Sequence, residues 1–443
     1  MARDLTRIGE KARKEPKLKF TSIYHFVTDK DHLRACYERI DPGAAAGVDG
    51  VTKEEYGKEV ERNLEDLVER LNRMGYRPMP VKRKLIPKAG SKKKRAIGIP
   101  SLEDKIVQKA LAGVLEQIYE TEFCESSYGY RPGRTPHDCL DELGRTIQQK
   151  KVNYVVEADI KGFFDHVNQE WLERFLEHRV SDERVHRLVK RMLKAGVMED
   201  GQVKASEEGV PQGGSLSPLL SNVYLHYTLD LWFERRFRSQ CRGEAYYFRF
   251  ADDFVACFQY REDAVRYLRE MERRLKEFSL EIEPSKTKLL EFGRFAEERA
   301  RRRGKEPEQF EFLGFTHYGH TTRHGKYKVK RMTSKRKIRA KLKEWNEWLR
   351  KERSHLKKGE LLRAAKVKLE GHLNYYAITD NRGKCDEFRK QVEGLMYKWL
   401  NRQSQRRSYT WGRFKDALAW VGWPSVRIRH NLDPFRRSAL NES

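Results

Sequence analysis

Hydrophobic residues recur at helical spacing through much of the chain, separated by shorter runs that alternate or cluster as strands do. The helical spacing predicts helices over residues 62–74, 101–119, 138–150, 169–195, 219–233 and 261–278. Two short alternating runs at 80–87 and 96–100 predict a hairpin, and residues 88–95 form its strongly cationic tip. This mixture of helices and strands predicts an α+β protein.

Two further apolar runs contain aspartates at positions where neither a strand nor a hairpin turn requires an acidic residue. The run from Tyr154 to Ile160 predicts a short buried strand that ends at Asp159. The run from 246 to 258 predicts a hairpin that turns on Asp252 and Asp253, although such turns usually contain Asn-Gly, Asp-Gly or another glycine pair. A strand is also expected at 280–283. Adjacent carboxylates repel each other, and this pattern therefore suggests a bound cation.

Beyond residue 330 the period is helical almost throughout. A linker at 295–307 precedes this region, and apolar stripes at 338–349, 362–373 and 388–399 define three amphipathic helices. Three such helices predict a small bundle, followed from Asn401 by a basic tail that contains tryptophans.

The charge of the chain indicates a polyanionic partner. At 443 residues the chain is long enough for two or three domains, and its formal net charge is +26. Residues 331–443 alone hold 29 Lys and Arg against 12 Asp and Glu. Solubility requires a much smaller net charge, and nucleic acid is therefore the expected partner.

The cysteines and the hydropathy indicate in which cellular compartment the protein works. The six cysteines lie far apart and form no Cys-x-x-Cys pair, which argues against a disulfide framework or zinc module. No apolar run reaches the length of a membrane span, and the N-terminus has no signal-peptide core. We therefore expect a cytoplasmic protein without a membrane partner; the sequence sets no oligomeric state.

The acidic positions are candidates for phosphoryl-transfer chemistry. Mg²⁺ prefers oxygen ligands and keeps positions open for substrate phosphate, so Asp252, Asp253 and a third carboxylate, Asp159, are candidate ligands. An Asp-Asp pair at a turn is more often simply solvated, and this interpretation depends on the motifs around it. In the cationic hairpin, Lys82, Lys88 and Arg95 are candidates to neutralise nucleotide phosphates, with a solvated basic loop as the alternative.

Six blocks in this order resemble those of group II intron-encoded reverse transcriptases, also called maturases. The blocks are Gly98-Ile99-Pro100, Glu157 to Asp165, Gly209 to Leu220, Phe250-Ala251-Asp252-Asp253, Pro284 to Lys288 and Phe312-Leu313-Gly314-Phe315. The similarity runs from about residue 20 to 425. It implies a right-hand polymerase fold and RNA-directed DNA polymerase activity.

The resemblance also implies roles for individual residues. It places the ligands of two Mg²⁺ ions on Asp159, Asp252 and Asp253. It places the steric gate that excludes a ribose 2′-hydroxyl on Phe164. The other residues that it implies for nucleotide binding are Gln212, Lys88, Arg95 and Lys286, the last in a block linked to protonation of pyrophosphate.

The resemblance divides the chain into four parts. Residues 1–50 are the N-terminal extension and RNA-contacting loop, 51–325 the fingers and palm, 330–400 the thumb or maturase domain, and 401–443 a basic DNA-binding tail. The implied partners are an RNA template, intron RNA, a DNA primer or target, and deoxynucleoside triphosphates. Two departures from the family pattern stand out: Phe250 replaces the usual tyrosine, and the tail lacks the paired cysteines of an HNH-type endonuclease, which is therefore not expected.

Three alternatives to an intron-mobility polymerase follow from the same residues. The chain could act mainly as an RNA-binding splicing cofactor, although a chain freed from catalysis has no need of a repulsive acid cluster. It could be a domesticated relative recruited to repair or defence. An RNA-templated RNA polymerase is disfavoured by Phe164.

Overall fold

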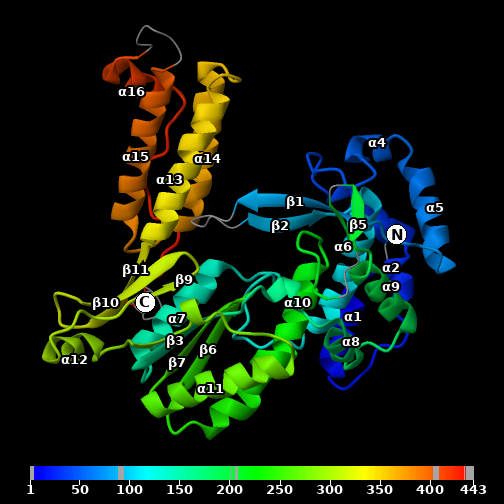
Figure 1. The fold of residues 1–443 in the computed structure, drawn as a ribbon, viewed down its shortest axis with the longest axis horizontal. Coiled ribbons are helices and arrows are strands. Elements are labelled where there is room, and N and C mark those ends of the chain that lie inside the picture. Colours follow the sequence, from blue (N-terminus) through cyan, green and yellow to red (C-terminus); the bar gives the residue numbers. More distant parts are fainter. Residues whose placement is uncertain are drawn as a thin grey trace, which may run out of the picture.

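The computed structural model describes residues 4–87, 94–199, 201–204, 208–402, 409–433 and 435. Three parts are visible in Figure 1: a helical N-terminal lobe, a central sheet, and a tall C-terminal helical bundle. The hairpin of β1 (Val81–Pro87) and β2 (Lys94–Ile99) extends from the lobe toward the bundle. Lys88, which belongs to the predicted cationic tip, lies outside the described residues.

The N-terminal lobe is built around one long buried helix, α6 (Leu102–Tyr119). Ser101 begins this helix by accepting a hydrogen bond from the backbone N–H of Asp104, as N-cap serines do. The other helices of the lobe are α1 (Thr6–Lys14), α2 (Tyr24–Val27), α3 (Lys30–Glu38), α4 (Lys53–Gly57), α5 (Val60–Asn72), α8 (Gln169–Glu177) and α9 (Glu183–Leu193). The short strands β4 (Val197–Glu199) and β5 (Gln202–Lys204) extend the β1–β2 sheet at its β1 edge.

The central sheet has the strand order β6-β7-β3-β8, and its neighbouring strands are antiparallel. Its strands are β3 (Tyr154–Asp159), β6 (Ala245–Phe250), β7 (Asp253–Phe258) and β8 (Lys288–Glu291). Both faces are covered: Val156 and Ala158 of β3 belong to the core shared with the N-terminal lobe, whereas Val155 belongs to a second core. Because side chains alternate along a strand, Asp159 faces the same side as Val155.

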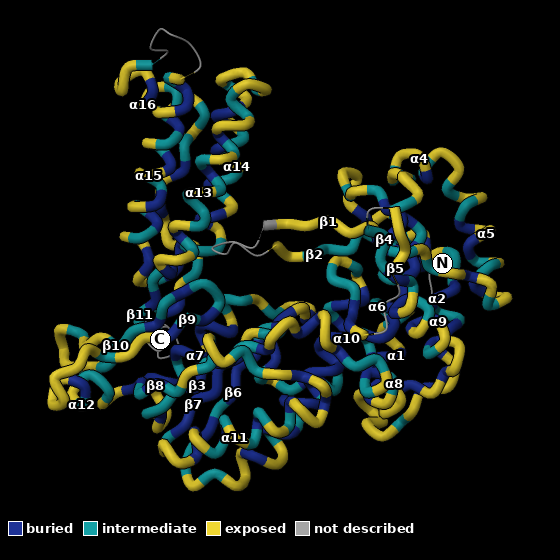
Figure 2. Tube along the Cα trace, viewed as in Figure 1, coloured by how far each residue is buried: buried dark blue, intermediate teal, exposed yellow. Residues whose placement is uncertain are grey.

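Helices α10 (Ser217–Leu225) and α11 (Arg261–Glu277) supply buried side chains to the first of these cores. Helix α7 (Pro136–Gln149) covers the other face together with β9 (Phe310–Phe312), β10 (Phe315–Thr321) and β11 (Tyr327–Thr333), which form a separate antiparallel sheet. Dark blue segments mark both buried layers in Figure 2.

The C-terminal bundle contains the three predicted helices and one more. Helices α13 (Lys335–Glu352), α14 (Lys358–Tyr376) and α15 (Arg382–Leu400) share a core with α16 (Trp411–Trp420). After α16 the chain runs back along the bundle, and Leu432 joins the second core, on the face of the central sheet that α7 covers. The described part of the tail is therefore packed against the bundle and its base.

Three expectations from the sequence are corrected. Residues 280–283 form only an isolated bridge, Ile282 to Ile160, because Pro284 has no N–H to donate and begins a single 3₁₀ turn; the strand starts at Lys288. The expected linker at 295–307 contains the short helix α12 (Ala296–Arg302). The helix expected at 219–233 ends as an α-helix at Leu225 and continues as wider π-helical turns.

Candidate active site

The acidic turn of the central sheet differs by one residue from the sequence prediction. Phe250 pairs with Asp253, so the two turn residues are Ala251 and Asp252, and Asp253 is the first residue of β7. Ala251 takes the left-handed conformation, with φ of 57°, that glycine or asparagine normally supplies in such a hairpin.

The three aspartates meet at one end of the sheet. In the pairing of β3 with β7, Asp159 lies directly opposite Asp253. Side chains of opposite residues on neighbouring strands point to the same face. The structure therefore brings together Asp159 and Asp253, which are far apart in the sequence, and places Asp252 in the adjoining turn.

A neighbouring loop holds the strained turn by close backbone packing. A Cβ added at Gly129 would lie only 2.3 Å from the backbone nitrogen of Ala251, so only glycine allows this approach. The backbone N–H of Tyr128 donates to the carbonyl of Arg249 at 2.8 Å, which attaches the same loop to β6.

A fully buried arginine holds the turn from beneath. Arg249 has no exposed surface, and its guanidinium makes two hydrogen bonds with the carboxylate of Asp230, at 2.8 and 2.5 Å. It also donates to Asn222 Oδ1 at 2.8 Å, to Ser127 Oγ at 2.8 Å and to the carbonyl of Ala251 at 3.1 Å. All five guanidinium N–H groups are thus used, and one of them holds the carbonyl of the left-handed turn residue.

The wider turns after α10 make this network possible. Asn222 and Asp230 are eight residues apart, and a regular α-helix would rotate their side chains about 80° from each other. The intervening π-helical turn, His226–Asp230, changes that rotation, and both side chains reach Arg249. Asn222 also donates to the carbonyl of Gly129 at 2.7 Å, so it joins the arginine to the loop.

The acid cluster is electrostatically frustrated. Asp253 is open to solvent, but protein surrounds it on several sides, and the resulting loss of hydration is the largest cause of a pKa raised to about 6. The negative charges of Asp252 and Asp159 raise this pKa further, and Lys337 and Lys286 oppose them. The Lys286 ammonium forms an ion pair with the carboxylate of Asp159.

These residues fit the ligand chemistry of Mg²⁺. All three carboxylates supply hard oxygen donors. The pKa of Asp253 is raised first by loss of hydration and then by the charges of Asp252 and Asp159, which a cation would neutralise. Over the described ranges, no three His, Cys, Asp or Glu side chains already form a closed metal-binding group. Asp159 is instead paired with Lys286, so an ion shared by the three acids would require this carboxylate to turn.

The predicted nucleotide-binding residues lie near one another only in part. The Arg95 guanidinium donates to Gln212 Oε1 at 2.6 Å, and the N–H of Gly98 donates to the carbonyl of Gln212 at 2.6 Å. Lys82 is exposed and pairs with Ile99, four positions along the hairpin from Arg95, which corresponds to about 13 Å. It is therefore not part of the Arg95–Gln212 group.

Phe164 lies beside the loop that carries Gln212. Its ring is 7% exposed and packs edge-on against Phe163, with 5.3 Å between the ring centroids. Its carbonyl accepts a hydrogen bond from the N–H of Val210 at 2.8 Å. The ring is therefore held in place rather than free to move aside.

The sequence reasoning missed the buried support of the site. Arg249, Asn222 and Asp230 are invisible to motif spacing because each looks like an ordinary polar residue in its own segment. The available signal was Arg249 itself, a charged residue within the apolar run from 246 to 258. A charge in a buried strand requires a counter-ion, and this requirement pointed to an acid elsewhere.

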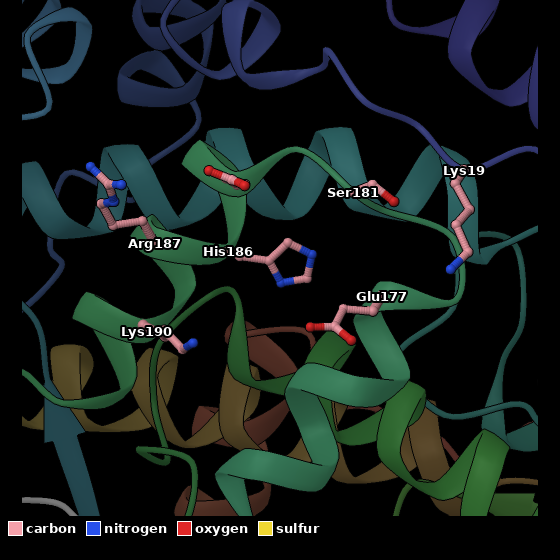
Figure 3. Close-up of a pocket in the computed structure, with 7 residues that line it drawn as sticks. Lys19, Glu177, Ser181, His186, Arg187 and Lys190 are labelled. Carbon is pink, nitrogen blue, oxygen red and sulfur yellow. The ribbon is translucent and has the colours of Figure 1, made fainter.

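A separate charged depression lies on the N-terminal lobe, on elements that carry none of the three aspartates (Figure 3). Its volume is about 460 Å³, and it is lined by Lys19, Glu177, Ser181, Glu183, His186, Arg187 and Lys190. It is held together by the pairing of Phe20 with Val180, between the chain before α2 and the α8–α9 connection.

The fold and the acidic hairpin together define a class of protein. Residues 86–317, more than half of the chain, match the family described as reverse transcriptase (RNA-dependent DNA polymerase). The chain therefore belongs to the reverse transcriptase family, and the group II intron type that the ordered motifs predict is confirmed. Within the described ranges no helix is both long and apolar enough to cross a membrane.

Particular relatives show how far the similarity extends. Group II intron-encoded protein LtrA of Lactococcus lactis subsp. cremoris is 34% identical over 222 residues, which are 50% of this chain and 37% of that protein. Protein YkfC of Escherichia coli (strain K12) is 31% identical over 302 residues, 61% of this chain and 79% of that protein. The match thus spans little more than a third of the length of LtrA.

Removing the counter-ion of Arg249 should destabilise the protein strongly. In the Asp230→Ala variant a buried guanidinium loses its carboxylate, and we expect the free energy of unfolding to fall by about 3–5 kcal/mol in urea denaturation. The control is Glu59→Ala, which breaks the exposed pair Arg62–Glu59 (3.1 Å) and should change stability by about 0.5 kcal/mol or less. Similar losses in the two variants would contradict this account of the network.

The Asp253→Asn variant should reveal the electrostatic cost of the site. Because the folded-state pKa of about 6 lies above the usual 3.8, the folded protein binds this proton more tightly than the unfolded chain does. Stability therefore falls as pH rises from 3.8 to about 6, and the neutral variant escapes that loss. We expect the variant to have the higher Tm at pH 7 without divalent ions, and this advantage to disappear near pH 4.

The same two proteins can be compared in the presence of Mg²⁺. An ion that binds only the folded protein raises its Tm, so Mg²⁺ should raise the Tm of the wild type more than that of Asp253→Asn. The same Mg²⁺-induced increase in both proteins would count against Asp253 as a ligand.

Proposed function

We propose that the protein is an RNA-directed DNA polymerase of the group II intron type, which joins a deoxynucleoside triphosphate to the 3′-hydroxyl of a primer. The observation that carries this proposal is the placement of Asp159 opposite Asp253 beside the acidic turn at Asp252. Membership of the reverse transcriptase family supports it.

Asp159, Asp252 and Asp253 are the residues that we assign to two Mg²⁺ ions. Bound Mg²⁺ would lower the pKa of the primer 3′-hydroxyl and neutralise the charge that develops on the triphosphate and pyrophosphate. The protein's own contribution is positioning: the register of β3 with β7 and the Arg249 network fix where the carboxylates stand.

We assign the nucleotide side of the reaction to the group around Gln212. Arg95 would offer a guanidinium fork to the phosphates, and the Phe164 ring would exclude a ribose 2′-hydroxyl. Lys286, paired with Asp159, is the residue that we assign to protonation of pyrophosphate. Lys82 and Lys88 belong to the same proposal as cations of the hairpin. Their part is to attract the triphosphate over a longer range.

In the domain assignment that accompanies this proposal, residues 1–50 contact RNA, residues 51–325 form fingers and palm, and residues 330–400 form the thumb. The template, primer or target DNA, and deoxynucleotides would lie between the lobe, the sheet and the bundle. A cytoplasmic location fits the six unpaired cysteines.

Assistance to intron RNA splicing is a second function that the bundle favours. Trp420 on α16 is 65% exposed, and the guanidinium of Arg363 stands 5.0 Å from its ring centroid. Exposed aromatic rings beside cations suit stacking on unpaired bases and contacts to phosphate. This surface supports nucleic-acid binding by residues 401–443 together with the bundle.

The Asp252→Ala variant tests the polymerase proposal. Purified wild-type protein should extend a DNA primer on an RNA template with Mg²⁺ and deoxynucleotides. Loss of one ligand should lower the extension rate at least about a thousandfold, since metal stabilisation of the transition state is worth several kcal/mol. Synthesis at the wild-type rate would refute the metal assignment.

Two controls accompany that assay. Asp66→Ala removes an exposed carboxylate on α5 and should leave extension unchanged. In a splicing assay with a cognate intron RNA, Asp252→Ala should remain active, because the acid turn is not part of the bundle surface.

The Phe164→Ala variant tests sugar selection. Removing the ring should open space for a 2′-hydroxyl, and the preference for dTTP over UTP in kcat/KM should fall by at least about tenfold. Phe237→Ala removes a fully buried ring that is not in contact with Phe164 and should lower stability without changing this preference. An unchanged preference in Phe164→Ala would exclude Phe164 as the gate.

A further inference from the structure

A second strained residue faces the acid turn from the loop that packs on it. Tyr130 has φ of 57°, a left-handed conformation that is unfavourable for a bulky side chain. Its neighbour Gly129 is the residue whose backbone touches Ala251. Two left-handed residues, Tyr130 and Ala251, thus belong to adjoining turns.

The loop around Tyr130 is firmly anchored, so its conformation is imposed by its surroundings. Arg131, 6% exposed, donates to the carboxylate of Glu120 at 2.7 Å and to the carbonyls of Cys124 and Ser127 at 2.8 and 2.7 Å. On the other side of Tyr130, the carbonyl of Gly129 accepts from Asn222.

Despite this rigid support, the Tyr130 ring itself projects outward. It is 54% exposed, which is unusual for a large aromatic residue in a tightly packed loop. Glycine would adopt the same backbone conformation without strain, so the local fold gives no reason for a tyrosine here. Strained residues of this kind cluster at sites of ligand contact.

Charges from both parts of the proposed active site act on the Tyr130 hydroxyl. Partial loss of hydration raises the pKa of the Tyr130 hydroxyl; the charge of Asp252 raises it further, and that of Arg95 lowers it. The phenol is therefore within electrostatic range of both the metal-binding acids and the phosphate-binding arginine.

We propose that Tyr130 is a specificity-determining residue that packs against the nascent base pair formed by the incoming deoxynucleotide and the template. This inference rests on the proposed polymerase function and adds a residue to that site. The loop is held rigidly against the acid turn, so a base pair of the wrong shape would lose the contact with this ring or collide with it. An aromatic contact with a base contributes enough to change rates about tenfold.

Single-nucleotide insertion measurements on the full chain test the assignment. For Tyr130→Ala we expect kcat/KM for the correct deoxynucleotide to fall about tenfold, mainly through KM, and the preference over a mismatched deoxynucleotide to fall about tenfold as well. Tyr130→Phe keeps the ring and should stay within about threefold of the wild type in both quantities.

Two further variants separate contact from backbone strain. Tyr130→Gly should be at least as stable to heat as Tyr130→Ala, because the strain is relieved, and yet show the same kinetic defects. Met74→Gly relieves the same φ of 57° in the N-terminal lobe and should leave insertion kinetics unchanged.

Each outcome decides the proposal. Equal losses for correct and mismatched nucleotides, or wild-type kinetics in Tyr130→Ala, would overturn the role of Tyr130 while leaving the polymerase function intact. A wild-type chain that extends no primer would overturn both.

Discussion

The buried guanidinium of Arg249 is the interaction on which the geometry of the site depends. It connects β6 to Asn222 within α10 and to Asp230 just after that helix. It also binds Ser127 in the neighbouring loop and the carbonyl of Ala251 in the turn. A buried ion pair of this kind is weak evidence for stability, because desolvation offsets most of the attraction. Its role here is to fix geometry. The five N–H donors of the guanidinium point in fixed directions, so they set how the segments that carry Asp230, Asn222, Ser127 and Ala251 are arranged around β6.

That arrangement explains why the acid turn contains no glycine of its own. In a hairpin, the left-handed conformation costs little free energy when the residue is glycine. Ala251 is instead held in this conformation by contacts from outside the hairpin. The glycine is displaced to position 129, where the absence of a side chain allows the supporting loop to touch the turn. Gly129 thus supplies space for the contact, while Ala251 itself keeps the positive φ.

The sequence predicted the parts of the fold that depend on local periodicity. The long helices of the bundle and the strand ending at Asp159 follow from the spacing of apolar residues, and the structure has them. The strand at 288–291 begins late because of one proline, Pro284. The π-helical turns after Leu225 depend on side chains that bind the distant Arg249. Tertiary contacts of this kind leave no periodic signal, so the pattern alone misplaced both.

The same limit applies to the site. Asp159, Asp252 and Asp253 were identifiable because acids in apolar runs require an explanation, and the pairing of β3 with β7 then brings Asp159 opposite Asp253. The turn was misplaced by one residue, because Asp-Asp looked like the turn and Ala251 did not look capable of positive φ. Lys82 and Arg95 both lie in the predicted cationic hairpin, and only the hairpin register shows that they are four positions apart along it.

The charges around the acids show how the fold accommodates a repulsive cluster. Lys286 reaches Asp159 because the turn after Pro284 brings it there instead of continuing the strand that the sequence predicted. Lys337, at the start of the bundle, also lowers the pKa of Asp253. Each cation comes from a different part of the chain, and both act without contributing a metal ligand. The bundle therefore acts on the acid site through its charge as well as by bounding the space above it. The placement of the C-terminal helices is in this way linked to the protonation of Asp253.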